Sequence, residues 1–296
     1  MHFLLHKCVV IKYRLEELLP GREVISMRIN NVNALWAWRN LQSTQRVLST
    51  TMETLITGSR IPRASFDVAG LAISQRLRAL TRGYETALNN IYNGIGMLRT
   101  AEGGLASITE ALQRMRELAV QASNGTLTET ERAALQQEFE QLRQGIAETV
   151  RNTNYNTIDV LAGEVQNVQI QTGPTEGETL NVTIPNMEPE ALGLNELNIS
   201  TIEGAQNAIS RLDEILENVS RVRSNVGSWM NRLEHAARNV GNAYVNTMSS
   251  LSTLADADMA RQILELTRLQ IIRQSNLAML GQANINNQSV LRLLIR

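Results

Sequence analysis

The sequence predicts a mainly α-helical protein: a long antiparallel, heptad-patterned helical bundle formed by the N- and C-terminal halves, with a small central β-hairpin. Three observations support this fold class. Apolar residues repeat every seven positions through much of both halves. Only 4% of the residues are aromatic, which favours long helices over a thick globular core. Between residues 161 and 198 the apolar residues alternate with polar ones instead, as in a strand.

Residues 77–122 carry the longest heptad seam. A 3.5-residue apolar period requires a helix to supercoil against partners. We therefore predict one long helix that stops near Asn124 and Gly125, two residues that tolerate positive φ. The seam consists of Leu77, Tyr84, Ile91, Leu98, Leu105, Leu112 and Ala119, each followed three residues later by Leu80, Ala87, Gly94, Ala101, Ile108, Met115 and Ala122.

A shorter heptad helix precedes this one. It is predicted to run from about residue 30 to residue 57, and Gly58 ends it. Residues 59–70, interrupted by Pro62, are expected to form a connector packed by Ile61 and Phe66. The apolar stripe of the helix is Ala34, Leu41, Leu48 and Leu55.

A third helix follows the long one. Thr128 and Glu131 have the spacing of a capping box, in which each side chain satisfies a free backbone N–H. The apolar residues behind it step by three and four, so this helix is expected to fold back antiparallel on the second. They are Leu135, Phe139, Leu142, Ile146 and Val150.

The alternating segment reads as a β-hairpin. Val168 and Ile170 alternate with polar residues, and so do Leu180, Val182 and Ile184 after the turn at residues 173–177. A single hairpin is marginally stable, so it must lean on the helices.

Heptads resume in the last third of the chain. Residues 201–254 are predicted to form a second long helix, and Asp256 and Asp258 to cap a final helix that runs to residue 294. One register of the long helix is Leu212, Val219, Val226, Leu233 and Val240. The adjacent register, which we expect to receive the 77–122 seam, is Ile209, Leu216, Met230, Ala237, Tyr244 and Leu251.

These elements predict a division of the chain into parts. Residues 27–58 and 256–296 are expected to form a pair of terminal helices, residues 59–70 the connector, and residues 71–255 a helical domain that includes the hairpin at 161–198. The terminal helices have too little core to be secure alone, which favours burial against other copies of the chain. The predicted polymerisation stripes are Leu41, Leu48, Leu55, Ile263, Leu266, Leu277 and Leu280.

Residues 1–26 differ from the rest. They hold both lysines (Lys7, Lys12) and the sole cysteine (Cys8). We interpret them as a non-native extension from a mis-assigned start, with Met27 the true first residue. A genuine leader or anchor is the alternative, although the short apolar run there is interrupted by His6 and Lys7.

Composition argues against several functions. A net charge of -1 gives no reason to expect nucleic acid as a partner, and no apolar run approaches a membrane span, so no membrane insertion is expected. Without cysteine after residue 26, disulfides and thiolate metal sites are excluded from that part. His235 is the only histidine there, and neither a zinc motif nor a phosphate loop accompanies it. We predict no enzyme activity, catalytic residue, cofactor or metal.

Four of the glycines within the long heptad helix are close together in two pairs: Gly94 with Gly96, and Gly103 with Gly104. Each costs a helix interior about 1 kcal/mol relative to alanine. They are expected either to mark where the helix bends or a neighbouring subunit approaches, or simply to allow close packing.

Several stretches together resemble bacterial flagellin, in a short form with a minimal central region. The resemblance implies a subunit of the flagellar filament, exported unfolded by the type III apparatus and self-assembling outside the cell into a helical tube for motility. Its terminal helices would form the inner tube and its long helices the shell. The implied partners are copies of itself, the export apparatus, an export chaperone, and filament cap and junction proteins. The stretches are Met27-Arg-Ile-Asn-Asn31, Asp67-Val-Ala-Gly-Leu-Ala-Ile-Ser74, Thr100-Ala-Glu-Gly-Gly-Leu105, residues 112–121 with Asn124-Gly125, Asp256-Ala-Asp-Met-Ala260, Gln282-Ala-Asn284 and Gln288-Ser-Val-Leu291.

Three alternatives and one further partner remain open at this point. An enzyme has no motif in its favour; a hook-filament junction protein shares flagellin-like termini; a generic coiled-coil scaffold predicts a stable rod. In the flagellin family, the helix matching residues 112–121 also binds an innate immune Toll-like receptor in responsive species. By resemblance, Arg114, Leu118 and Glu138 are candidate contacts for that receptor or for lateral neighbours in the filament.

Overall fold

The structure is a computed structural model that describes the backbone of residues 32–294 and the side chains of residues 32–286. The interpretation of residues 1–26 as a non-native extension therefore lies outside the described residues. The described chain divides into two compact units. One combines the residues up to Pro62 with those from Ala257 onward, and the other is Arg63–Asp256.

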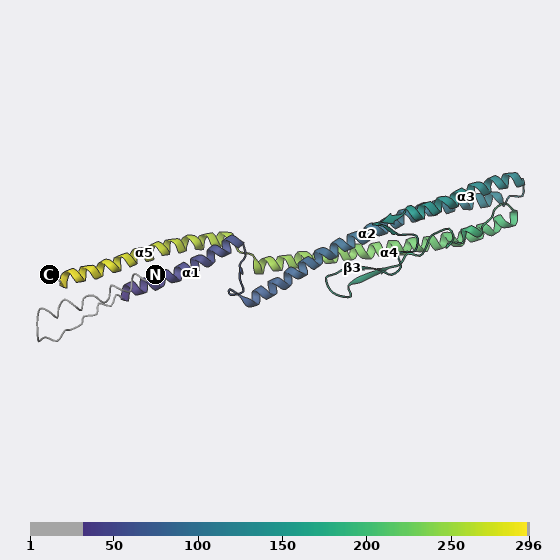
Figure 1. Cartoon of the computed structure of the whole chain (residues 1–296). Coiled ribbons are helices and arrows are strands. Elements are labelled where there is room, and N and C mark those ends of the chain that lie inside the picture. Colours follow the sequence, from purple (N-terminus) through teal and green to yellow (C-terminus); the bar gives the residue numbers. More distant parts are fainter. Residues whose placement is uncertain (1–31, 295–296) are drawn as a thin grey trace. The chain divides into compact units, whose positions relative to one another are not determined.

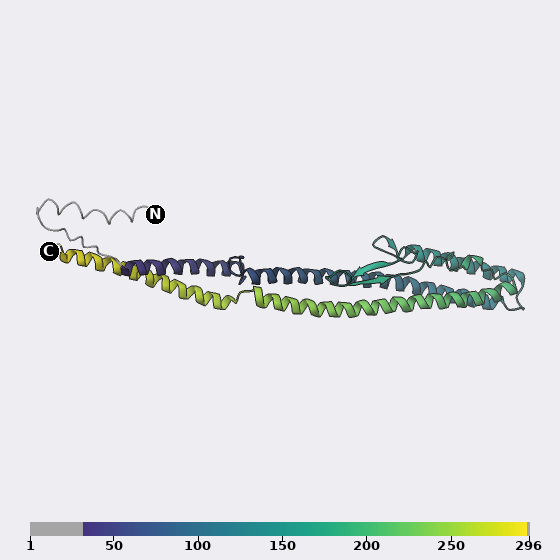
Figure 2. The same cartoon turned by 90° about the horizontal axis from the view of Figure 1, so that it is seen from below.

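The first unit is a pair of helices. α1 (Val32–Thr57) and α5 (Met259–Leu294) lie side by side in both views (Figure 1, Figure 2). Gly58 ends α1 with φ of 64°, as predicted, and its carbonyl accepts from the Ala257 amide at 2.9 Å. Asp258 caps α5, because its Oδ1 accepts a hydrogen bond from the Arg261 amide at 3.1 Å.

The second unit is built on two long helices. α2 (Val68–Ala122) and α4 (Ile202–Ala255) pack along one another, and α3 (Glu129–Asn152) packs on α2 (Figure 2). The heptad seam of α2 forms the core from Ala87 onward, and the prediction of a mainly helical bundle is confirmed. Its fully enclosed members include Ile91, Leu98, Leu105, Ile108, Leu112 and Met115.

The register of α4 differs from our expectation. The Leu212–Val240 series is buried, whereas the Ile209–Leu251 series is only half-buried. Heptad spacing alone allows either series to face α2. However, a seven-residue repeat that starts at Ile209 passes through Arg223 and would place this residue in the seam. Burying an unpaired guanidinium is costly, and Val222 is buried in its place. The seam is completed by Ala205, Ala208, Ile215 and Val222.

The centre of the chain carries two hairpins. The predicted one is confirmed: β3 (Val168–Gln171) pairs antiparallel with β4 (Thr179–Val182), with Ile170 opposite Leu180. Ile170 packs on α2 at Gly94, so the hairpin does lean on a helix. The second hairpin, β1 (Asn154–Tyr155) with β2 (Ile158–Asp159), and a short 3-10 helix, η2 (Leu194–Glu196), were not predicted.

Two further expectations need correction. α2 begins at Val68, inside the predicted connector, because Asp67 Oδ1 accepts from the Gly70 amide at 2.8 Å and caps the helix. Ile61 is buried as expected, but Phe66 is 40% exposed, with the guanidinium of Arg63 5.7 Å from its ring centre.

α2 stops where expected, for a different reason. It ends at Ala122, and neither Asn124 nor Gly125 has positive φ. Ser123 keeps a right-handed conformation, and Asn124 then turns the chain by accepting from the Leu127 amide at 3.3 Å.

Candidate functional site

The most unusual surface in the described chain is the outside of the α1/α5 pair. Fourteen large apolar side chains are exposed on these two helices, including Ile56 at 85% and Leu264 at 73%. By comparison, the unit 63–256 exposes eight. The fourteen are Val32, Leu35, Trp36, Trp38, Val47, Met52 and Ile56 on α1, and Met259, Ile263, Leu264, Ile271, Leu277, Met279 and Ile285 on α5.

The inside of the pair is thin by contrast. Small side chains and threonines form most of it, and each buried threonine hydroxyl donates to a carbonyl of its own helix. A side-chain hydrogen bond links the helices, from Asn276 Nδ2 to Thr44 Oγ1 at 3.2 Å. The large apolar residues of this unit therefore lie mostly outside it. All buried residues in the described part of this unit, apolar and polar together, are Ala37, Thr44, Leu48, Thr51, Thr54, Ile61, Leu269 and Ala283.

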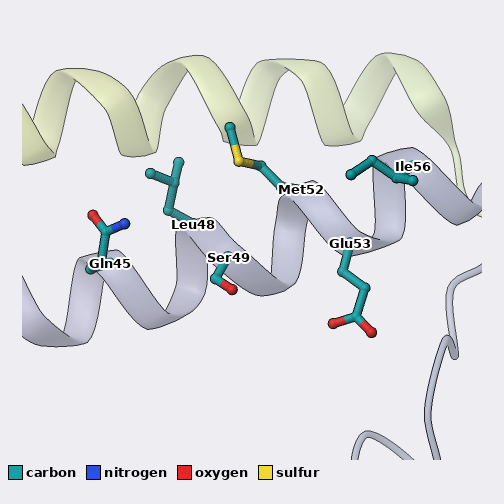
Figure 3. A pocket seen from close by; sticks show the side chains of 6 residues that line it. All are labelled: Gln45, Leu48, Ser49, Met52, Glu53 and Ile56. Carbon is teal, nitrogen blue, oxygen red and sulfur yellow. The ribbon is translucent and has the colours of Figure 1, made fainter.

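Figure 3 shows how α1 presents its side chains beside α5. Leu48 and Met52 point toward α5, whereas Glu53 points away from it. Leu48 is 3% exposed, but Met52 and Ile56 remain exposed at the edge of the pair. These residues line a shallow depression of about 370 Å³ together with Gln45, Ser49 and Glu53.

The predicted polymerisation stripes do not lie on one surface. Leu48 is buried between α1 and α5, whereas Ile263 and Leu277 are exposed. Leu41, Leu55, Leu266 and Leu280 are half-buried at the edges. The heptad pattern alone could not separate the residues that join the two helices from those that face outward.

A second surface feature joins α2 to α3. Arg114 donates to Glu138 Oε1 from Nη2 at 2.8 Å and from Nε at 3.1 Å, and to Glu117 from Nη1 at 3.0 Å. Hydrogen bonding to Glu138, and then to Glu117, raises the pKa of Arg114 above its ordinary value. Leu118, the third candidate contact, is 1% exposed and belongs to the core. Only Arg114 and Glu138 of the three candidate contacts lie together at the surface.

Two ion pairs that tie α2 to α4 were missed at the sequence level. Arg116 Nε lies 2.6 Å from Asp213 Oδ1, and Arg223 Nη2 lies 2.7 Å from Glu102 Oε1. The hydrogen bond from Arg116 holds the pKa of Asp213 below its ordinary value. The sequence signal for these ion pairs was the presence of opposite charges beside the seams of α2 and α4. The charged residues could not be paired, however, before the register of α4 was known.

The helix glycines pack against the protein's own central region. A Cβ on Gly94 would lie 2.7 Å from Ile170 Cδ1, one on Gly104 2.6 Å from Leu161 Cδ1, and one on Gly96 3.2 Å from Tyr155 Oη. Gly103 alone of the four has open space where a Cβ would lie. Close packing within the subunit thus accounts for three of these glycines.

The sole histidine after residue 26, His235, lies on α4. His235 Nδ1 lies 3.0 Å from Arg238 Nη2 on the same helix. Across residues 32–286 no three His, Cys, Asp or Glu side chains gather as a metal site would require. Within the same described region, no helix combines the length and apolarity needed to span a bilayer.

The chain combines a helical bundle with a pair of terminal helices that expose apolar side chains. This combination is typical of structural proteins that associate with one another through their helices. Comparisons with known proteins name the family. The family model for the bacterial flagellin N-terminal helical region matches residues 29–166, and the model for the C-terminal helical region matches residues 209–294. The chain therefore belongs to the bacterial flagellin family.

Individual relatives agree with this assignment. A flagellin of Halalkalibacterium halodurans is 42% identical over 90% of this chain and 98% of its own length. The flagellar filament core protein flaB2 of Brachyspira hyodysenteriae is 38% identical over the same shares. A solved structure assigned as a flagellar hook-associated protein of Vibrio parahaemolyticus shares the fold alone, at 16% identity and a TM-score of 0.55, over 64% of this chain and 100% of that one.

The family settles the broad function. The chain is a structural subunit of the bacterial flagellar filament and acts outside the cell. The relatives similar over 90% of the chain are flagellins and filament core proteins, and none of the findings favours a junction protein or a generic scaffold.

Proposed function

We propose that α1 and α5 drive polymerisation by burying their exposed apolar side chains against other copies of this chain, and so form the inner core of the filament. The observation that carries this proposal is the set of fourteen large apolar side chains exposed on the pair. Fully burying one such side chain is worth about 1.5–3 kcal/mol. A few of them can therefore outweigh the cost of ordering a subunit in the filament.

The unit 63–256 has the complementary role in this proposal. Its core is closed by α2, α3, α4 and the hairpins, so it folds as a self-sufficient shell element. The exposed ion pair of Arg114 with Glu138 links α2 to α3, and in this proposal it and the pair with Glu117 also face neighbouring subunits or solvent.

Point variants on α5 test the proposal. Leu264→Gln keeps a helix-forming residue but removes apolar surface from a 73% exposed position. We expect the critical concentration for seeded polymerisation to rise about tenfold or more, with the unfolding of the unit 63–256 unchanged. Gln270→Ala, at an exposed polar position on the same helix, is the control. Equal critical concentrations for Leu264→Gln and the unaltered chain would contradict the proposal.

The remaining partners are proposed from the family resemblance. They are the flagellar export apparatus, an export chaperone, and the filament cap and junction proteins. The thin core of the α1/α5 pair supports export in an unfolded state, since a pair of this kind gains most of its stability only on assembly. The proposed role is structural rather than catalytic.

An innate immune receptor is the last proposed partner. The exposed, paired side chains of Arg114 and Glu138 support a contact there, with Leu118 serving to hold α2 in place from the core. Charge reversal of both residues together, tested in a receptor-binding assay with the unpolymerised chain, should weaken binding. Unchanged binding would remove this partner from the proposal.

A further inference from the structure

Two Asn-Gly dipeptides occur in the chain, and the structure places them in opposite environments. Asn93-Gly94 lies in the middle of α2, and Asn124-Gly125 lies in the turn that follows it. In an Asn-Gly sequence the glycine nitrogen can attack the asparagine side chain, because no Cβ hinders its approach. Whether it does so depends on whether the backbone is free to bring these atoms together.

The turn leaves the nitrogen of Gly125 free. Asn124 and Gly125 are both exposed, and a Cβ on Gly125 would meet nothing within 4 Å. Asn124 accepts from the Leu127 amide at 3.3 Å, so Gly125 is the first central residue of a β-turn. Among the described residues the amide of Gly125 donates no hydrogen bond.

The same turn activates the asparagine side chain. The Thr126 amide donates to Asn124 Oδ1 at 3.1 Å, and this bond closes a ring of side chain and backbone that spans Gly125. That donor is aimed at the oxygen on which negative charge develops when a nucleophile adds to the side-chain carbonyl. A free nucleophile and a polarised carbonyl therefore stand next to each other.

The helical site lacks both conditions. Asn93 is also exposed, but Gly94 is buried beneath Ile170. Inside a helix the Gly94 amide is committed to the carbonyl four residues earlier. Reaction at Asn93 requires the middle of α2 to open first.

We infer that Asn124 is a site of spontaneous deamidation through a cyclic succinimide. The Gly125 nitrogen gives its proton to hydroxide and bonds to Asn124 Cγ. The Cγ–Nδ2 bond then breaks, and the departing nitrogen takes a proton from water and leaves as ammonia. Water then adds to one of the two ring carbonyls and breaks its bond to the ring nitrogen. Opening at one carbonyl gives aspartate, and opening at the other gives isoaspartate. Overall an amide and water become a carboxylate and ammonium, with no change of oxidation state.

The product alters the connection between α2 and α3. Isoaspartate routes the backbone through the former side chain and adds a methylene at the residue whose carbonyl accepts from Leu127 and, at 3.3 Å, from Arg132 Nη1. Each subunit that ages in this way gains one negative charge at an exposed turn.

The chain itself supplies a matched comparison. Because no lysine follows Lys12, trypsin cuts this part of the chain only after arginine, and the two dipeptides fall in separate peptides, 83–99 and 117–132. The purified full chain is incubated at mildly basic pH, digested, and both peptides are followed by mass spectrometry. An isoaspartyl methyltransferase assay identifies the isoaspartate product. Gly125→Ala, which meets no neighbour, is the variant.

We expect peptide 117–132 of the folded chain to convert at least about tenfold faster than 83–99, with the difference disappearing in denaturant. Gly125→Ala should slow the reaction. The inference is overturned if the two peptides of the folded chain convert at equal rates, if the difference persists in denaturant, or if Gly125→Ala converts as fast as the unaltered chain.

Discussion

At the residue scale, adjacent glycines in α2 have opposite surroundings. A Cβ on Gly104 would lie 2.6 Å from Leu161 Cδ1 and 2.7 Å from Thr153 Oγ1, whereas one on Gly103 would meet nothing within 4 Å. The two positions share the same helix and the same intrinsic cost of glycine. Comparing them separates packing from helix propensity.

We predict that Gly104→Ala destabilises the unit 63–256 by about 1–3 kcal/mol, because the core must shift to admit the methyl group. Gly103→Ala should stabilise it by up to about 1 kcal/mol, the ordinary gain from removing a helix glycine. Denaturant unfolding of both variants measures these changes. Similar effects of the two substitutions would contradict the packing at Leu161 and Thr153.

The Arg116–Asp213 pair makes a pH-dependent contribution to stability. Asp213 has a folded-state pKa below its unfolded value, mainly because it accepts a hydrogen bond from Arg116. Its contribution is therefore fully present above the unfolded pKa of about 3.9 and is lost as pH falls through the folded value. The effect should be small, since both side chains are about half exposed.

Unfolding free energies measured from about pH 6 down to about pH 2 check this. The unaltered chain should lose stability on acidification more steeply than Asp213→Asn, which cannot titrate at that position. Arg116→Gln should remove the same part of the slope. Parallel pH profiles for all three chains would show that the pair does not couple to folding.

At the scale of elements, the start of α3 depends on a reciprocal cap. Thr128 Oγ1 accepts from the Glu131 amide at 3.3 Å, and Glu131 Oε2 accepts from the Thr128 amide at 2.7 Å. The second bond is the main reason that the pKa of Glu131 lies below its ordinary value. This cap was predicted from sequence, because its signal needs only two residue types at a fixed spacing.

Thr128→Ala should destabilise the first turn of α3 by about 0.5–2 kcal/mol. Amide hydrogen exchange should rise at residues 129–132 and much less in the middle of α2. Thr126→Ala is the control, because the backbone amide of Thr126, not its hydroxyl, makes the hydrogen bond in this turn. Equal exchange in the two variants would mean that the capping box does not hold α3.

Elements with a long, regular pattern were predictable, and those that depend on local strain were not. The α2 seam and the β3/β4 hairpin carry repeated apolar signals. The β1/β2 hairpin turns at Asn156 and Thr157, with φ of 50° and 67°, where such turns favour Asn-Gly. Threonine at positive φ is uncommon, so no sequence signal marked this turn.

The surfaces were less predictable than the elements for a similar reason. Sequence showed that Leu118 and Arg114 lie on the same helix, but not that the leucine is buried in the core while the arginine side chain stays half exposed. Likewise, the pairing of Arg223 with Glu102 could not be predicted before the register of α4 was known. Tertiary packing decides which side of a helix faces its neighbour. Heptad spacing alone does not distinguish between two adjacent registers.

At the scale of the whole molecule, the two units differ in how many of their large apolar side chains are buried and how many are exposed. The unit 63–256 encloses most of its large apolar side chains, whereas the α1/α5 pair exposes more of them than it buries. We attribute the filament's cohesion to the pair and the stability of the isolated subunit to the unit 63–256. A consequence is that the ends of the chain can be lost without unfolding the centre.

Seeded polymerisation of the full chain, compared with a chain that ends at Asp256 and therefore lacks α5, tests this division most directly. Electron microscopy should show filaments from the full chain and none from the shortened one, while near-ultraviolet circular dichroism shows the unit 63–256 still folded in both. Filaments from the shortened chain as abundant as those from the full chain would contradict the account.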